Sequence, residues 1–182
     1  MLDIHQHKDS LPLQGERLTV RLLTESDLSD RYLSWLNDPE TVQFSNQRFL
    51  IHNIDSARHY FKSFTDSPNL FFAIEDQQSR QLVGTMTVYI QAHHDTADVG
   101  ILLGEKRLWG KGYGGEAWNL VVNWLLDTCQ ARKVTAGTIA CNLGMVRLME
   151  RAGMLHEATR QQQELINNKP QDIVYFAKFH AV

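Results

Sequence analysis

The sequence contains very little cysteine, and its cysteines are not spaced for a disulfide framework or a zinc site. Only Cys129 and Cys141 occur in 182 residues, and they do not form a Cys-x-x-Cys motif. A run of 18 or more apolar residues is also missing, as is an N-terminal basic stretch followed by an apolar one. We therefore expect a cytoplasmic protein without a metal site or a membrane segment.

The sequence also lacks a strong excess of charge of either sign. The 18 Lys and Arg residues against 21 Asp and Glu give a net charge of −3, which predicts binding to neither nucleic acid nor an anionic membrane. Any phosphate must then be held by a few local groups. With 43% apolar residues, the length predicts a single domain over residues 1–182, with residues 1–13 as a loose lead-in.

Changes in hydrophobic periodicity along the chain predict an α/β fold of mixed strands and helices. Alternating or continuous apolar runs indicate strands, and apolar residues at three- and four-residue spacing indicate amphipathic helices. The resulting order predicts a mixed sheet with helices packed on its faces. The expected strands are 19–23, 70–75, 81–90, 97–103, 133–140, 157–165 and 171–179, and the expected helices lie within 24–39, 55–64, 114–128 and 142–152.

The most informative segment is a glycine-rich turn, ILLGEKRLWGKGYGGEAW, at residues 101–118. It places Gly110, Gly112, Gly114 and Gly115 between an expected strand and an expected amphipathic helix. Glycines let a ligand approach the backbone N–H groups closely, and the start of a helix directs its positive dipole end to the same point. The pattern therefore predicts an anion site suited to a phosphate or pyrophosphate.

Three phosphate-binding motifs compete for this turn. A P-loop fails, because its second glycine would fall on Trp109 and Lys111 is followed by Gly112 rather than Ser or Thr. A dinucleotide G-x-G-x-x-G matches at Gly110, Gly112 and Gly115, but it does not directly follow a strand and no carboxylate ends the next strand. The acyl-CoA pyrophosphate motif R/Q-x-x-G-x-G/A reads directly from Arg107 to Gly112.

With this motif the chain resembles the GNAT (Gcn5-related N-acetyltransferase) superfamily. WGKGYGGEA is similar to the branch of ribosomal-protein N-terminal acetyltransferases and small-molecule amine acetyltransferases. RLTVRLL, LVGTMTVYI, ADVGILLG and NLGMVRLMERAGM resemble further segments of that branch, so the likeness covers most of the chain. It implies a mostly antiparallel twisted sheet of about six to seven strands with helices on both faces, acetyl-CoA as the acetyl donor, and possible homodimers.

The resemblance also implies a set of residues that bind acetyl-CoA. The strand before the turn pairs its main chain with the pantetheine arm, the turn holds the pyrophosphate, and an Asn after the next strand contacts the pantetheine. Carried over to this sequence, the set is Ile101, Leu102, Leu103, Arg107, Trp109, Gly110, Lys111, Gly112, Tyr113, Gly114, Gly115 and Asn142.

The catalytic groups depart from the family pattern. Where many members have a general-acid Tyr, and a related branch has a Ser, this chain has Met149 and Met145, which fit core packing. For the base, Asp98 is the candidate, because His93 and His94 are expected in an exposed turn at the other end of the strands. A chain that binds acyl-CoA as a sensor without catalysis stays an alternative.

For the acceptor amine, residues 32–49 resemble acetyltransferases of surface-polysaccharide synthesis. This resemblance implies an amino-sugar nucleotide as the first choice, and the α-amine of a protein N-terminus as the alternative. The residues expected to line the acceptor cleft are Trp35, Asn37, Phe44, Arg48 and Phe49, although Trp35 and Phe44 fit the core equally well.

Overall fold

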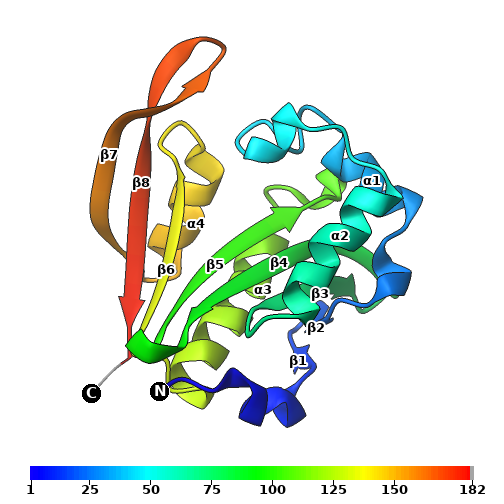
Figure 1. Ribbon diagram of the computed structural model, residues 1–182, viewed down its shortest axis with the longest axis vertical. Coiled ribbons are helices and arrows are strands. Elements are labelled where there is room, and N and C mark those ends of the chain that lie inside the picture. Colours follow the sequence, from blue (N-terminus) through cyan, green and yellow to red (C-terminus); the bar gives the residue numbers. More distant parts are fainter. Residues whose placement is uncertain (181–182) are drawn as a thin grey trace.

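One twisted sheet of eight strands organises the fold (Figure 1), which we describe from a computed structural model covering residues 1–180. Neighbouring strands are antiparallel except β5 and β6, which run parallel. The two-residue β1 raises the number of strands above the expected six to seven, because so short a strand leaves no periodic signal. In spatial order the strands are β1 (Leu13–Gln14), β2 (Leu18–Leu22), β3 (Leu70–Asp76), β4 (Gln81–Gln91), β5 (Thr96–Leu103), β6 (Lys133–Ile139), β8 (Lys169–Phe179) and β7 (Leu155–Ile166).

Helices cover both faces of this sheet, as expected. Helices α1 (Asp30–Leu36) and α2 (Ile54–Thr65) pack on one face, and α3 (Tyr113–Asn123) and α4 (Leu143–Arg151) on the other. Strand β3 is buried along its whole length because both of its faces are covered. The α3 helix continues through a π turn, Trp124–Thr128.

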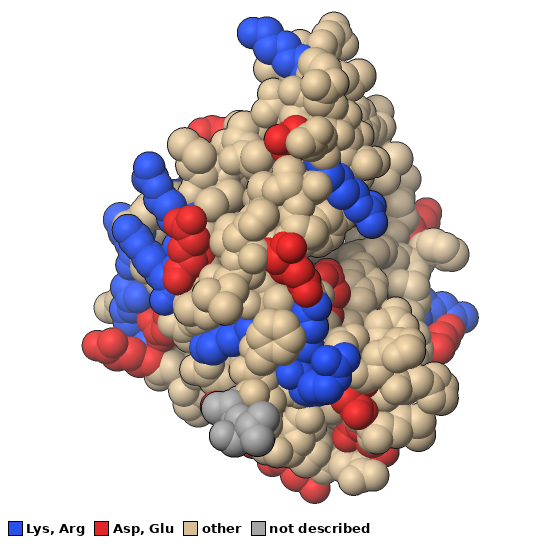
Figure 2. All heavy atoms as spheres, turned by 90° about the vertical axis from the view of Figure 1, so that its left-hand side faces the viewer, with Lys and Arg blue, Asp and Glu red and all other residues tan. Residues whose placement is uncertain are grey.

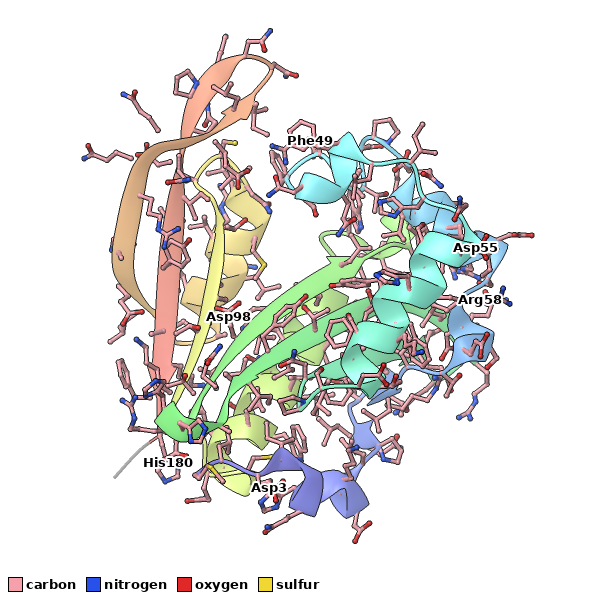
Figure 3. All side chains as sticks on the ribbon, viewed as in Figure 1. Asp3, Phe49, Asp55, Arg58, Asp98 and His180 are labelled. Atoms are coloured by element: carbon pink, nitrogen blue, oxygen red, sulfur yellow. The ribbon has the colours of Figure 1, made fainter. Side chains whose placement is uncertain are left out.

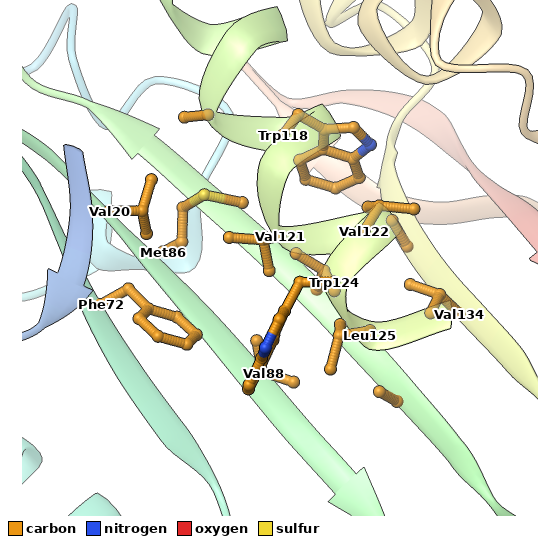
Figure 4. Close-up of a cluster of buried hydrophobic side chains, with 14 of the residues drawn as sticks. Val20, Phe72, Met86, Val88, Trp118, Val121, Val122, Trp124, Leu125 and Val134 are labelled. Atoms are coloured by element: carbon orange, nitrogen blue, oxygen red, sulfur yellow. The ribbon is translucent and has the colours of Figure 1, made fainter. Parts of the chain in front are cut away.

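The larger core lies between the sheet and α3 (Figure 4). Phe72 and Val88 of the sheet are fully buried and face Val121 and Trp124, with the rings of Phe72 and Trp124 6.0 Å apart in an edge-on contact. Burying a Phe or Val side chain contributes about 1.5–3 kcal/mol. This core fixes α3, and with it the glycine-rich turn that precedes α3, against the strands.

The N-terminal segment differs from its prediction as a loose lead-in. Ile4 is 2% exposed and joins the larger core together with Leu2, and the segment forms a 3-10 helix, Ile4–Ser10. The amide of Leu2 donates to the carbonyl of Ala92, and the Trp124 indole donates to Ser10 Oγ at 2.7 Å. Two apolar residues in a polar stretch give no periodic pattern, so the sequence did not reveal this packing.

The central strands β5 and β6 separate soon after they begin. They pair over only three positions, Thr96 with Lys133, Ala97 with Val134, and Asp98 with Thr135. Beyond Asp98, β5 follows β4 while β6 follows β8, and the two halves of the sheet diverge (Figure 1). Among residues 1–180, one side of β5 therefore has no strand partner from Val99 onward.

Charges of both signs are mixed on the face formed by the C-terminal hairpin (Figure 2), in keeping with the small net charge. Within residues 1–180, no helix is both long and apolar enough to cross a bilayer. The same residues contain no group of three or more His, Cys, Asp or Glu side chains arranged to hold a metal ion.

Candidate active site

The glycine-rich turn has the geometry of an anion-binding loop. Gly110 and Gly112 have positive φ angles of 72° and 85°, which residues with a Cβ rarely adopt. Gly112 caps α3, and the first amide bonded within the helix is that of Glu116, which donates to the Gly112 carbonyl at 3.0 Å. The N–H groups of residues 113–115 therefore have no partner within the helix and can bind an anion.

The outer side of this turn is open to a ligand. A Cβ placed on Gly110 or Gly115 would meet no atom within 4 Å. Arg107 is exposed and pairs with Glu105 at 3.4 Å. The Trp109 indole turns back and donates to the Leu103 carbonyl at 2.7 Å, so Trp109 ties the turn to β5.

Strand β5 presents alternate main-chain groups to its open side. The amide of Gly104 donates to the carbonyl of Val83 in β4. Because main-chain groups alternate in direction along a strand, Leu102 also directs its N–H and C=O to β4. Ile101 and Leu103 then direct theirs to the side that β6 has left. Leu102, predicted as a cofactor contact, packs its side chain with α1 and α2 instead.

Asn142 is the N-cap of α4, as the sequence predicts. Its Oδ1 accepts from the Met145 amide at 3.3 Å, and its Nδ2 donates to Thr138 Oγ1 at 3.1 Å. The prediction that both methionines pack in the core is also confirmed, since Met149 is fully buried and Met145 packs against the larger core. Neither methionine can donate a proton.

Replacing Asn142 with Ala is expected to lower the free energy of unfolding by about 0.5–2 kcal/mol, the usual loss for a helix cap. Urea unfolding measures the change. Asn142→Asp is the matched control, because a carboxylate oxygen still accepts from the Met145 amide. Equal losses in the two variants would contradict the capping role.

A cavity of about 250 Å³ lies where β5 and β6 separate, and we name it the β5–β6 cavity. Asp98 points into this gap (Figure 3). The segment before α2 covers one side of it, and β6 and the C-terminal hairpin form the other. Its lining residues are Phe44, Asn46, Asp98, Gly137, Thr138, Ile139, Glu164, Ile173 and Tyr175.

Asp98 is a partly desolvated carboxylate within reach of a bound molecule. It is open to water in the β5–β6 cavity, but protein surrounds it on its other sides. This partial burial raises the pKa of the Asp98 carboxyl, and a hydrogen bond from Thr135 Oγ1 at 2.7 Å opposes the rise. Tyr89 lies directly opposite Asp98 on β4 and shares a hydrogen bond of 2.9 Å with the Tyr60 hydroxyl.

Of the residues predicted to line the acceptor cleft, Phe44 lines the β5–β6 cavity, and Arg48 is bonded to Glu164 of its lining. Arg48 Nη2 reaches across the cavity to Glu164 Oε2 at 3.4 Å and to the Leu165 carbonyl at 3.3 Å. Its guanidinium also lies 4.3 Å from the ring centre of Phe49, which is itself 70% exposed. Phe49 therefore supports Arg48 and does not form the wall.

Trp35 and Asn37 lie elsewhere, which corrects their prediction as cleft residues. Trp35 is 7% exposed and packs in the smaller core against the backbone of Gly104. The Asn37 side chain exchanges two hydrogen bonds of 2.8 Å with the backbone of His52, so it fixes the loop before α2. An aromatic residue and an amide in a cleft-forming segment look the same in sequence whether they face a ligand or the core.

The geometry agrees with what comparison with known proteins shows. A family model described as an acetyltransferase (GNAT) domain matches residues 17–155. The chain belongs to the GNAT acetyltransferase family. A probable N-acetyltransferase of Bacillus subtilis, YjcK, is 31% identical over 168 residues, which are 88% of this chain and 92% of that protein. The resemblance drawn from the sequence and the expectation of an N-acetyltransferase are thus confirmed.

Three further proteins are similar to this chain. An uncharacterised protein of Methanocaldococcus jannaschii is 25% identical over 84% of this chain, but the match spans only 31% of that protein. The structure of spermidine N-acetyltransferase from Vibrio cholerae with CoA and spermine has a TM-score of 0.81, 20% identity, and coverage of 91% of this chain and 97% of its own. The structure of ribosomal-protein-S5-alanine acetyltransferase from Vibrio fischeri has a TM-score of 0.74 and 17% identity, and the match covers 93% of this chain and 97% of that chain. These two structures confirm the predicted fold.

Proposed function

We propose that this GNAT enzyme transfers an acetyl group from acetyl-CoA to a small cationic primary amine held in the β5–β6 cavity. The observation that carries the proposal is the Asp98 carboxylate, which lines the cavity and makes no ion pair among residues 1–180, whereas Glu164 of the same wall is paired with Arg48. A carboxylate without an ion-pair partner in this cavity favours an ammonium group over an anion.

The residues around the open side of β5 fit acetyl-CoA. The main-chain groups of Ile101 and Leu103 face the pantetheine side, and the turn at Gly110 and Gly112 offers room and free N–H groups for a pyrophosphate. Asn142 lies at the end of β6 on the same opening. When bound, acetyl-CoA supplies an activated acetyl thioester.

Asp98 is the proposed proton acceptor. An amine that binds as its ammonium form must lose a proton before its nitrogen can attack a carbonyl carbon. The raised pKa of Asp98 brings this carboxylate closer to the pKa of an amine, which improves its match as a base. The carboxylate also attracts the ammonium into the cavity.

The wall disfavours the amino-sugar nucleotide that the sequence resemblance suggested first. A nucleotide diphosphate requires cationic partners, and the nearby guanidinium of Arg48 is already paired with Glu164. The α-amine of a protein N-terminus requires an opening for the residues that follow it, and the bond from Arg48 to Leu165 narrows this end of the cavity.

A cytoplasmic location and a homodimer stay predictions.

Free-thiol release from acetyl-CoA tests the proposal across four classes of amine: small di- and polyamines, aminoglycosides, N-terminal peptides and amino-sugar nucleotides. We expect turnover with the small cationic amines. Turnover confined to amino-sugar nucleotides or peptides would overturn the acceptor assignment but keep acetyl transfer. Tight acetyl-CoA binding with no thiol release in any class would favour the sensor alternative.

Replacing Arg48 with Met is expected to open the end of the β5–β6 cavity. The variant loses the bridge to Glu164 and Leu165 while it keeps a similar side-chain volume. We expect kcat/KM for long amines relative to short ones to rise about tenfold, roughly the value of one charged hydrogen bond.

Arg58→Met is the matched control for this change. Arg58 pairs with Glu25 on the outer side of α2, away from Asp98 (Figure 3). An unchanged ratio of long to short amines in Arg48→Met would show that the bridge does not limit the acceptor.

A further inference from the structure

Arg17 lies at the glycine-rich turn, although it precedes β2 and is far from the turn in sequence. Its backbone N–H and its Nε each donate to a different carboxylate oxygen of Glu116, both at 2.8 Å. Its Nη1 donates to the Lys111 carbonyl at 2.8 Å, and its guanidinium carbon lies 4.4 Å from the ring centre of Tyr113. The Arg17 side chain thus contacts Lys111, which precedes the N-cap Gly112, and also Tyr113 and Glu116, which follow it.

The bond to Lys111 sets the direction of a peptide group in the turn. In a planar trans peptide the C=O and the following N–H point in opposite directions. Because the Lys111 carbonyl points to Arg17, the Gly112 N–H points away from it. Gly112 is held closely in this arrangement, since a Cβ at that position would lie 3.3 Å from Arg17 Nη2.

Arg17 also neutralises a carboxylate next to the anion site. Glu116 lies in the first turn of α3, and its burial would raise the pKa of its carboxyl, but the hydrogen bonds from Arg17 outweigh this and lower it. Glu116 is therefore charged at neutral pH. Without Arg17, its uncompensated negative charge would repel a phosphate at the start of the helix.

We propose that Arg17 is a positioning residue for acetyl-CoA, which fixes the turn at Lys111, Gly112 and Tyr113 and cancels the charge of Glu116. The inference rests on the proposed use of acetyl-CoA. It predicts that loss of Arg17 weakens binding of CoA more than it slows transfer from the bound donor. It also predicts that removing the charge of Glu116 in the same chain restores part of the affinity.

Calorimetric titration of the full-length protein with CoA tests the inference without relying on activity. Arg17→Gln is expected to raise the Kd about tenfold, the value of one charge-assisted hydrogen bond. The double variant Arg17→Gln with Glu116→Gln is expected to recover part of this loss. In turnover assays, the KM for acetyl-CoA should rise while kcat and the KM for the amine stay within about twofold of wild type.

Arg21→Gln is the matched control, because Arg21 lies on β2 and pairs with the buried carboxylates of Asp27 and Glu75. It should lose stability but keep the wild-type Kd for CoA. If Arg17→Gln does not fold, Arg17→Lys takes its place, since it keeps the charge but not the paired hydrogen bonds. An unchanged Kd in the Arg17 variant would overturn the inference, whereas a wild-type protein that does not bind CoA would overturn the proposed function instead.

Discussion

An Asp98→Asn variant is expected to lose about 10²–10⁴-fold in kcat/KM at neutral pH, the usual contribution of a general base. Asn keeps the size of the side chain and can still hydrogen-bond to Thr135, but it cannot accept a proton from an ammonium. Because Asp98 lies in an open cavity and makes no ion pair in the described structure, the variant should fold normally. Steady-state kinetics with the preferred amine and a CD spectrum measure the two effects.

The pH dependence distinguishes a base from a residue that only attracts the amine. Partial burial raises the pKa of Asp98, so the acid limb of the wild-type kcat/KM profile should lie above the range of an ordinary carboxyl. Thr135→Val removes the hydrogen bond that lowers this pKa, and its acid limb should move higher still. If Asp98→Asn keeps the wild-type acid limb, another group is the base.

The Asp98→Asn substitution should lower activity without lowering the free energy of unfolding. A carboxyl whose pKa is higher in the folded state binds its proton more tightly when folded, so its contribution to stability is lost as pH rises through that pKa. Above that pKa the ionised Asp98 therefore costs stability, and Asp98→Asn should unfold at an equal or higher urea concentration than wild type. A destabilised variant would mean that Asp98 has a structural role.

The sequence predicted those parts of the site that depend on neighbouring residues. The turn from Arg107 to Gly112 was recognisable because its glycine spacing and the following amphipathic helix are local features. The cap at Asn142 and the strands on either side were predicted for the same reason. The structure adds the positive φ angles of Gly110 and Gly112, which explain physically why glycine occupies these positions.

Parts of the acceptor side and the support of the glycine-rich turn depend on contacts between distant residues, and the sequence pattern gave no sign of these contacts. Arg48 meets Glu164 across 116 positions, and Arg17 meets Glu116 across 99. Glu164 lies in a strand that looks like any exposed, polar hairpin, so no local signal marks it as part of a cavity. Tertiary packing likewise decides whether the Trp35 side chain faces the core or the cleft.

Gly104→Ala is expected to lower the free energy of unfolding by about 3 kcal/mol, at the upper end of the usual cost of overpacking a core. A Cβ at this position would lie 1.9, 2.3 and 2.5 Å from three ring atoms of Trp35. Trp35 cannot easily move, because it is 7% exposed and packs edge-on against Tyr32. Urea or thermal unfolding measures the loss.

Gly115→Ala is the matched control, since its Cβ would meet no atom within 4 Å and it lies in a helix, where Ala is favoured over Gly by about 0.5–1 kcal/mol. It should therefore keep or gain stability. A small loss in Gly104→Ala, similar to that of the control, would show that the backbone at Gly104 can move away from Trp35.

The clash can be tested directly by reducing the ring that causes it. Trp35→Leu alone should destabilise the protein, because it leaves a cavity in the smaller core. In the Gly104→Ala background the same change relieves the overlap, so it should cost much less or even stabilise. A double-mutant cycle therefore predicts a favourable coupling between the two substitutions. Gly104 joins β5 to the turn proposed to hold the pyrophosphate, so we expect Gly104→Ala to weaken acetyl-CoA binding and the double variant to recover part of it.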